Sequence, residues 1–164
     1  MKTVYLIGGT MGVGKTTVCR ELKKELDRSV FLDGDWCWDA NPFQVTEETK
    51  TMVLENICFL LNQFIRCSAY EHVIFCWVMH EQKILDTILE HIDVTGCEVK
   101  NISLVCSPQT LIGRLEQDIA AGIRNERVIE RSIARIPFYR VLNTTKIETD
   151  GKSVHQIASE IIAD

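Results

Sequence analysis

Short apolar segments alternate along the chain with longer segments in which apolar residues recur every three or four positions. The short segments are rich in β-branched and aromatic residues, which predicts strands, whereas the longer periodicity predicts helices. The predicted strands are residues 3–7, 30–32, 73–78, 99–106 and 146–148. The predicted helices are residues 15–27, 46–65, 84–92, 108–119 and 153–162. Each predicted strand is thus followed by one predicted helix.

Residues that favour helix N-termini support three of these helices. Thr46 is a predicted N-cap for the second helix. Ser107 followed by Pro108 places an N-cap before a proline at the first helical position of the fourth helix. Ser153 and Gln156 have the spacing of a capping box. The starts of these helices can therefore be predicted from local chemistry as well as from periodicity.

The alternation of strands and helices predicts the fold class. Apolar strands that are joined by helices form a parallel sheet with helices on both faces. A chain of 164 residues has the length of one domain. We therefore expect a single α/β domain around a five-stranded parallel sheet, with its ligand site at the carboxyl ends of the strands.

The composition narrows the classes of partner. Hydrophobic residues make up 46% of the chain and charged residues 25%, and the formal net charge is −5, which argues against a nucleic-acid polymer as partner. No apolar run approaches the roughly 20 residues of a membrane-spanning helix, so no membrane partner is expected. The seven cysteines are scattered and include no Cys-x-x-Cys pair. We therefore expect reduced thiols in a cytoplasmic protein.

The strongest chemical signal follows the first predicted strand. Residues 9–16, Gly-Thr-Met-Gly-Val-Gly-Lys-Thr, match the phosphate-binding pattern G-x-x-x-x-G-K-[ST] at every fixed position. Glycines let backbone N–H groups converge on phosphate oxygens, and the following helix adds its positive dipole end. Lys15 is predicted to act on the β- and γ-phosphates, and Thr16 to bind Mg²⁺. The predicted seat of Mg-ATP is Gly9, Thr10, Met11, Gly12, Val13, Gly14, Lys15, Thr16 and Thr17.

Motifs of other phosphate-loop proteins do not occur in the chain. A regulatory GTPase would need an Asn-Lys-x-Asp motif, and an ABC-type ATPase a Leu-Ser-Gly-Gly motif. A ring-forming motor would have an acidic pair at the end of an apolar strand, whereas the third predicted strand is followed by Met79 and His80. A compact kinase is the class that remains.

Two carboxylates flank a glycine at the end of the second predicted strand, in the sequence Asp33-Gly34-Asp35. One carboxylate can hold Mg²⁺ through its water shell, and the other can orient an acceptor hydroxyl or take its proton. The structural alternative is a common Asp-Gly surface turn. The nearby phosphate loop favours the functional interpretation.

Arginines gather in the C-terminal part of the chain. Six of the nine are Arg114, Arg124, Arg127, Arg131, Arg135 and Arg140. Residues 120–127 interrupt the helical pattern and predict a mobile lid. Because a guanidinium fork matches the oxygens of a phosphoryl group, Arg124 and Arg127 are candidate catalytic residues. We expect two or three of the six to reach phosphate and the others to form surface pairs.

These motifs together resemble the shikimate kinase, gluconate kinase and nucleotide kinase branch of the P-loop kinases. The resemblance is carried by residues 9–16, 33–35, 111–115 and 135–139. It implies a three-layer fold, with an arginine-bearing lid near residues 120–127 and a substrate-binding region near residues 34–66. It also implies transfer of the γ-phosphoryl group of ATP to a small-molecule hydroxyl or a nucleotide, with Mg²⁺ as the metal.

The resemblance also implies roles for single arginines. Arg114 would stack on the adenine base. Arg124 or Arg127 would contact the phosphates from the lid. Arg135, in its Arg-x-Pro-x-Tyr setting, would contact the substrate.

On the acceptor side, the resemblance places Asp33 near Mg²⁺ and Asp35 near the accepting hydroxyl. The neighbouring Trp36 either stacks on the substrate or anchors its loop on the core. Where shikimate kinases have a run of glycines after the third strand, this chain has the bulkier Trp77-Val78-Met79-His80. The sequence therefore predicts a differently shaped acceptor site.

Two hypotheses about function follow. The first is an ATP-dependent phosphotransferase that acts on a small-molecule hydroxyl or a nucleotide. The second is a binding protein that is gated by ATP and has no small-molecule kinase activity. The carboxylate pair favours the enzyme, because a sensor needs no acceptor-side base. The sequence leaves the identity of the acceptor and the oligomeric state open.

Overall fold

The computed structural model describes residues 1–164 and contains one parallel sheet. Its five strands are β1 (Lys2–Gly8), β2 (Ser29–Asp33), β3 (His72–Trp77), β4 (Cys97–Val105) and β5 (Thr145–Glu148). Their order is β2-β3-β1-β4-β5, and all four neighbouring pairs are parallel. The predicted five-stranded parallel sheet is therefore confirmed.

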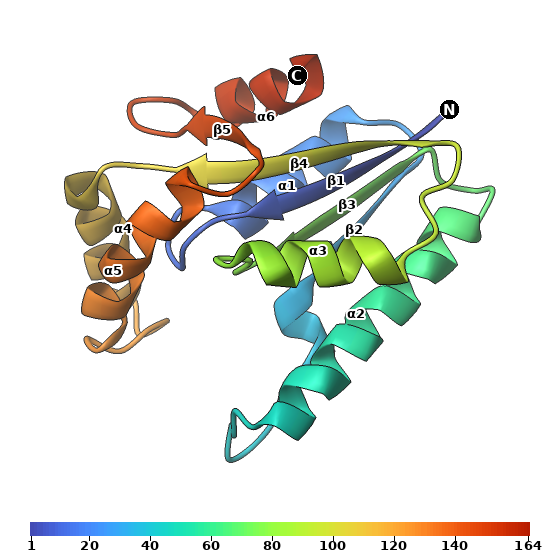
Figure 1. Ribbon diagram of the computed structural model, residues 1–164. Coiled ribbons are helices and arrows are strands. Elements are labelled where there is room, and N and C mark those ends of the chain that lie inside the picture. Colours follow the sequence, from blue (N-terminus) through green and yellow to red (C-terminus); the bar gives the residue numbers. More distant parts are fainter.

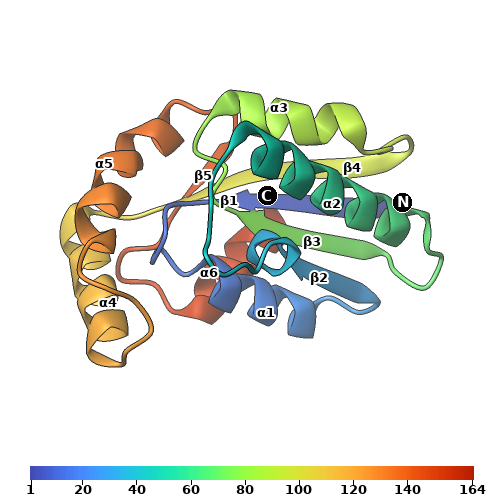
Figure 2. The ribbon, with the colours of Figure 1, turned by 90° about the horizontal axis from the view of Figure 1, so that it is seen from below.

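Six α-helices surround the sheet (Figure 1). They are α1 (Lys15–Glu25), α2 (Glu47–Arg66), α3 (Gln82–His91), α4 (Pro108–Ala120), α5 (Val128–Arg140) and α6 (Val154–Ala163). A short 3-10 helix, η1 (Gly34–Cys37), follows β2 directly. The helices α1 and α6 cover one face of the sheet, and α2 and α3 cover the other (Figure 2).

The core is divided by the sheet into two parts. Side chains from β1 alternate between them, so that Tyr5 and Ile7 pack toward α1 and α6, whereas Val4 and Leu6 pack toward α2 and α3. The first strand is central and buried on both faces, as its continuous apolar sequence predicts. This burial gives the loop after β1 a rigid base.

The capping chemistry also agrees with the predictions. The Thr46 side chain accepts a hydrogen bond from the backbone N–H of Thr49 at the start of α2. Ser153 and Gln156 form the capping box of α6. The Ser107 side chain accepts from the N–H group of Thr110 at the start of α4. These three helix starts are thus fixed by residues that the sequence identifies.

The sequence did not predict α5 as a separate helix. Its buried positions include the polar Ser132, and Pro137 lies inside it, so the apolar periodicity is weak. Packing stabilises the helix instead, because Val128, Ile136 and Tyr139 are buried against the rest of the protein. The helices α4 and α5 lie together at the carboxyl ends of the strands (Figure 1).

No helix combines the length and the hydrophobicity needed to cross a lipid bilayer. All seven cysteines are free, as predicted.

Candidate active site

The loop between β1 and α1 has the conformation of a phosphate loop. Gly12 and Gly14 have φ angles of 88° and 104°, a region that L-residues with side chains rarely adopt. A Cβ atom on Gly12 would also lie 2.5 Å from Cδ2 of Leu115, so α4 leaves no room for a side chain. Gly12 is therefore required both by the backbone and by packing, whereas Gly14, where an added Cβ atom would meet nothing within 4 Å, is required by the backbone alone.

Lys15 lies at the first position of α1, and its ammonium group curls back over the loop. Its Nζ atom donates hydrogen bonds to the carbonyl oxygens of Gly9, at 2.7 Å, and Thr10, at 3.1 Å. Desolvation lowers the pKa of Lys15, whereas the neighbouring carboxylates of Asp33 and Asp35 act in the opposite direction. The ammonium group is thus held against the loop on which the motif predicts phosphate binding.

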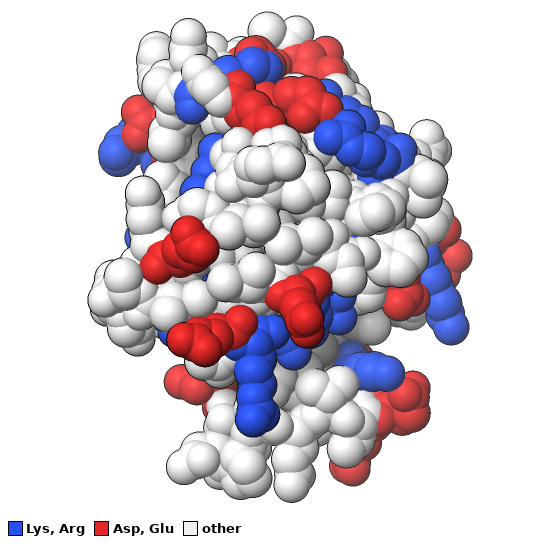
Figure 3. Space-filling view, turned by 90° about the vertical axis from the view of Figure 1, so that its left-hand side faces the viewer, with Lys and Arg blue, Asp and Glu red and all other residues white.

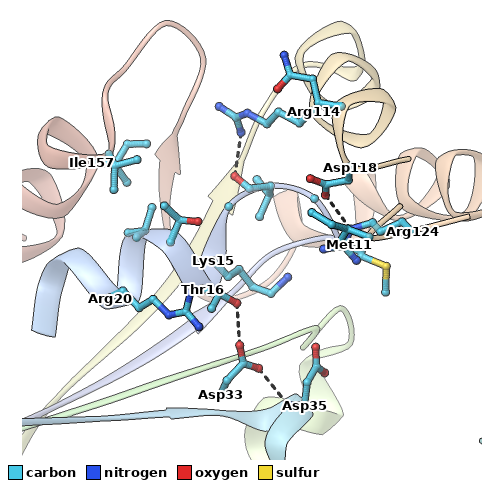
Figure 4. Close-up of a pocket in the computed structure, with 18 of the residues that line it drawn as sticks. Met11, Lys15, Thr16, Arg20, Asp33, Asp35, Arg114, Asp118, Arg124 and Ile157 are labelled. Atoms are coloured by element: carbon cyan, nitrogen blue, oxygen red, sulfur yellow. Dashed lines mark hydrogen bonds and ion pairs between the residues drawn. The ribbon is translucent and has the colours of Figure 1, made fainter. Parts of the chain in front are cut away.

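A chain of polar contacts links α1 to the end of β2 (Figure 4). The Thr16 hydroxyl donates to Oδ2 of Asp33 at 2.7 Å. The other oxygen of Asp33, Oδ1, accepts from the backbone N–H of Asp35 at 3.0 Å. Asp33 is buried, with 5% of its surface exposed. The two residues predicted to serve the metal are therefore in direct contact.

Asp35 lies one residue beyond Gly34, on η1, and is exposed on the same side of the sheet edge as Lys15 (Figure 4). Desolvation by neighbouring atoms and repulsion from Asp33 raise the pKa of Asp35. Lys15, Trp77 and Arg124 partly offset this rise. A carboxylate with a raised pKa and a nearby ammonium group is a suitable proton acceptor.

These groups share one cavity of about 530 Å³. The cavity is lined by Met11 to Val18, by both carboxylates of the Asp33-Gly34-Asp35 turn, and by side chains of α4, the following loop and α6. Its volume is in the range of small-molecule sites. Gly9 and Thr10, which were predicted to seat ATP, contribute to the loop but not to this lining.

Arg114 reaches the cavity from α4. Its Nη1 atom donates to the carbonyl oxygen of Val13 at 2.8 Å and to Oγ1 of Thr149 at 3.1 Å. These bonds fix the guanidinium plane beside the phosphate loop (Figure 4). Its predicted contact with adenine remains a prediction, and its position at the cavity wall is compatible with it.

The loop between α4 and α5 comprises residues 121–127, so the predicted lid at 120–127 matches it except for Ala120, which ends α4. Arg124 lines the cavity and its Nε atom pairs with Oδ2 of Asp118 at 2.8 Å. Arg127 is exposed and does not line the cavity. Of the two lid arginines, the structure brings only Arg124 to the phosphate loop.

The predicted acceptor-side residues are more dispersed. Arg135 is half-buried on α5 and does not line the cavity. Trp36 has 56% of its surface exposed, and its ring packs edge-on against Phe31, with the centroids 5.1 Å apart. Trp77 instead packs against Gly34, where a Cβ atom would lie 2.5 Å from Cγ of the indole. Their roles toward a substrate remain predictions.

The sequence analysis missed three charged residues that line the cavity: Arg20, Asp118 and Lys152. Asp118 could have been found, because it lies one helical turn after Arg114 on the same helix. Arg20 could have been found in the same way, because it lies one helical turn after Thr16 on α1. Lys152 gave no local signal, since its position depends on how the loop between β5 and α6 packs.

The surface near α4 and α5 carries side chains of both charge signs between uncharged areas (Figure 3).

Comparison with known proteins now identifies the family. The family model described as AAA domain matches residues 6–133. A shikimate kinase of Bacillus cytotoxicus is 28% identical over 171 aligned positions, which cover 99% of this chain and 97% of that protein. The chain belongs to this AAA domain family, among its P-loop small-molecule kinases. It is thus an enzyme that transfers a phosphoryl group from ATP to a small molecule.

Solved structures show the same fold as this kinase. The tunicamycin resistance protein of Deinococcus radiodurans has a TM-score of 0.76 at 17% identity, over 99% of this chain and 95% of that one. A gluconokinase from Sinorhizobium meliloti has a TM-score of 0.71 at 16% identity, over 98% of this chain and 90% of that one. At these identities the likeness concerns the fold alone.

Proposed function

We propose that this kinase transfers the γ-phosphoryl group of Mg-ATP to a hydroxyl group of a small molecule or a nucleotide, at the site between the phosphate loop and Asp35. One observation carries this proposal: Lys15, the Thr16–Asp33 pair and Asp35 line one cavity, although they come from three separate elements, α1, β2 and η1. The set supplies a phosphate-binding cation, hard oxygen ligands and a carboxylate base.

The residues at the end of β2 fit a magnesium ion. Hydroxyl and carboxylate oxygens are the ligands that Mg²⁺ prefers, and it usually keeps several of its waters. The Thr16 hydroxyl and Oδ2 of Asp33, 2.7 Å apart, are donors of this kind. When bound, the ion would neutralise charge on the β- and γ-phosphate oxygens. Thr16 would contact it directly, and Asp33 would hold its waters.

Asp35 would serve the acceptor. Its carboxylate would accept the proton of the attacking hydroxyl while the hydroxyl oxygen forms a bond to the γ-phosphorus atom. The bond between that phosphorus and the bridging oxygen of ADP breaks, so the products are ADP and a phosphate ester. Lys15 and Arg124 would stabilise the charge of the moving phosphoryl group.

The acceptor would enter between η1 and the lid. Residues 34–66 form its proposed binding region, with Arg135 approaching from α5. The indole of Trp77 lies against Gly34, at the start of this region. We infer an acceptor whose shape differs from that of shikimate, although shikimate kinases are among the relatives of this chain.

A coupled assay for ADP formation tests the proposal. The panel should contain cyclic alcohols including shikimate, sugars and sugar acids, and nucleoside monophosphates. We expect one class to stimulate ATP consumption with formation of its phosphate ester. Binding of ATP without stimulation by any member would instead favour the ATP-gated binding protein.

Asp35→Asn is the matched variant for this assay. It keeps the size of the side chain and removes the base. We expect turnover to fall by about 100-fold or more, with little change in ATP affinity. An equal loss of turnover and ATP affinity would assign Asp35 a structural role instead.

A further inference from the structure

One buried hydrogen bond joins the phosphate loop to α5. The hydroxyl of Thr10 donates to the carbonyl oxygen of Ser132 at 2.8 Å, across 122 positions of sequence. Thr10 has 3% of its surface exposed and Ser132 has 2%. Because a buried hydroxyl that loses its partner is costly, the loop and the helix are held to one relative position.

A second contact lies two helical turns further along α5. The ring of Tyr139 packs on Gly8, where a Cβ atom would lie 3.5 Å from Cε1 of the ring. Tyr139 is buried, with 1% of its surface exposed. The helix therefore rests on residues 8–10 at two points, immediately before the phosphate-binding turn.

Thr10 also contacts the catalytic lysine, through its backbone. Its carbonyl oxygen accepts a hydrogen bond from Nζ of Lys15 at 3.1 Å. Oxygens of the β- and γ-phosphates compete with this carbonyl for the same ammonium group. The carbonyl group of Thr10 thus contacts the lysine that is proposed to bind phosphate, whereas its hydroxyl group contacts α5.

We propose that Thr10 is a positioning residue that links nucleotide binding at the phosphate loop to the position of α5. A phosphate that draws Lys15 away from the carbonyl of Thr10 changes the loop at the residue on which α5 is anchored. Arg135 lies three residues after Ser132, so it is carried by the anchored part of this helix. The role of Arg135 rests on the proposed function, whereas the link itself does not.

The link predicts an order of binding. Nucleotide bound at the loop steadies α5 and with it the acceptor side, so the acceptor binds more tightly after ATP than before it. A ligand shifts such an equilibrium only through a difference in affinity between the two positions of the helix. Coupling energies between sites commonly correspond to factors of about 5 to 150.

Hydrogen exchange tests the link without an acceptor. The full chain is measured with and without magnesium and a non-hydrolysable ATP analogue, at a saturating concentration for each variant. In the natural protein we expect the analogue to slow exchange in residues 128–140 by at least about fivefold. Thr10→Val, which keeps the shape but lacks the hydroxyl, should lose this slowing. Thr10→Ser, which keeps the hydroxyl, should retain it.

Tyr139→Phe is the second control, because it keeps the ring on Gly8 and removes only a hydroxyl that has no hydrogen-bond partner. It should respond to the analogue as the natural protein does. Thr10→Ala replaces Thr10→Val if the latter does not fold. Equal slowing in the variant without the hydroxyl and in the natural protein would overturn the proposal, as would an absence of slowing in the natural protein. If no molecule of the acceptor panel stimulated ATP consumption, both outcomes of the hydrogen-exchange experiment could still be interpreted, because that experiment uses no acceptor.

Discussion

At the scale of single residues, Asp35 combines exposure with an environment that disfavours its charge. Desolvation and Asp33 raise its pKa above the ordinary value of 3.8. The folded protein therefore binds the proton more tightly than the unfolded chain does. Between the pKa of Asp35 in the unfolded chain and its higher pKa in the folded protein, the free energy of unfolding falls as the pH rises. Above both pKa values the ionised carboxylate continues to lower the free energy of unfolding.

This sign gives a prediction for Asp35→Asn. At neutral pH the variant should unfold at a higher temperature than the natural protein, because the cost of the charge is removed. Well below pH 3.8 this cost should vanish, since the carboxyl of the natural protein is then protonated in both the folded and the unfolded state. Scanning calorimetry at the two pH values measures this. Asp39→Asn, in the exposed loop that follows, is the control, and an unchanged midpoint of Asp35→Asn at pH 7 would contradict the argument.

Gly34 is a residue whose lack of a side chain is required by packing. A Cβ atom there would lie 2.5 Å from Cγ of Trp77 and 2.9 Å from its Cβ atom. Gly34→Ala must therefore displace the indole, and we expect a loss of about 1–3 kcal/mol in the free energy of unfolding. Urea denaturation measures this loss.

Gly113→Ala should have the opposite effect on stability. Gly113 lies inside α4, and nothing comes within 4 Å of an added Cβ atom. The same substitution should stabilise the protein there by about 0.5–1 kcal/mol, through helix propensity alone. Unchanged or higher stability of Gly34→Ala would show that the packing argument for Gly34 is wrong, and lower stability of Gly113→Ala would contradict the argument from helix propensity.

Several of these residues could be predicted from the sequence and others could not. Lys15, Thr16 and the carboxylate pair follow from short motifs whose geometry is local. The contact between Gly34 and Trp77 joins the ends of two neighbouring strands, so it depends on a strand order that the sequence does not state. Lys152 reaches the cavity for a similar reason, because the packing of the loop between β5 and α6 positions it.

At the scale of elements, one ion pair restrains the loop between α4 and α5. Nε of Arg124 lies 2.8 Å from Oδ2 of Asp118, and about 30% of each side chain is exposed (29% and 31%). Partly exposed pairs of this kind contribute up to about 1 kcal/mol. The pair therefore restrains the loop weakly, as a lid that opens and closes requires.

Asp118→Asn should loosen this loop. We expect limited trypsin digestion after Arg124 and Arg127 to become about two- to fivefold faster, which corresponds to the loss of one such pair. Mass spectrometry of the fragments identifies the cleaved bonds. Glu116→Gln, at an exposed position of α4 that is distant in sequence from both cleaved bonds, should leave the rate unchanged. Equal rates for the Asp118 variant and the natural protein would show that the pair does not restrain the lid.

The elements themselves were predicted with uneven success. Helices α2, α4 and α6 begin where their capping residues indicate, because capping is a local interaction. Helix α5 was not predicted as a separate element, since Ser132 and Pro137 weaken its apolar pattern. The backbone carbonyl of Ser132 accepts a hydrogen bond from Thr10, on a distant part of the chain, so this contact holds the helix whatever side chain stands at position 132.

At the scale of the whole molecule, nucleotide binding should appear as global stabilisation. A ligand that binds only the folded state at 100 times its Kd adds about 2.7 kcal/mol, which corresponds to a rise of roughly 5–10 °C in Tm for a chain of this size. Mg-ATP should produce this rise in the natural protein. Lys15→Ala should fold but lose most of the shift, which differential scanning fluorimetry can measure.

Lys23→Ala is the matched control, because Lys23 is an exposed lysine of the same helix, α1, and does not line the cavity. It should keep most of the shift. If Lys15→Ala were stabilised by Mg-ATP as strongly as the natural protein, the proposed role of the phosphate loop would have to be abandoned.

The order of the strands divides the enzyme along its chain. The strand β1 is central; β2 and β3, which come from residues 29–77, lie on one side of it, and β4 and β5, which come from residues 97–148, lie on the other. The proposed acceptor region thus forms one continuous stretch of the gene, and the lid forms another. An insertion, deletion or recombination in the first stretch can change which molecule is phosphorylated while the nucleotide-binding machinery stays intact, so new specificities are accessible to this architecture through changes confined to one segment.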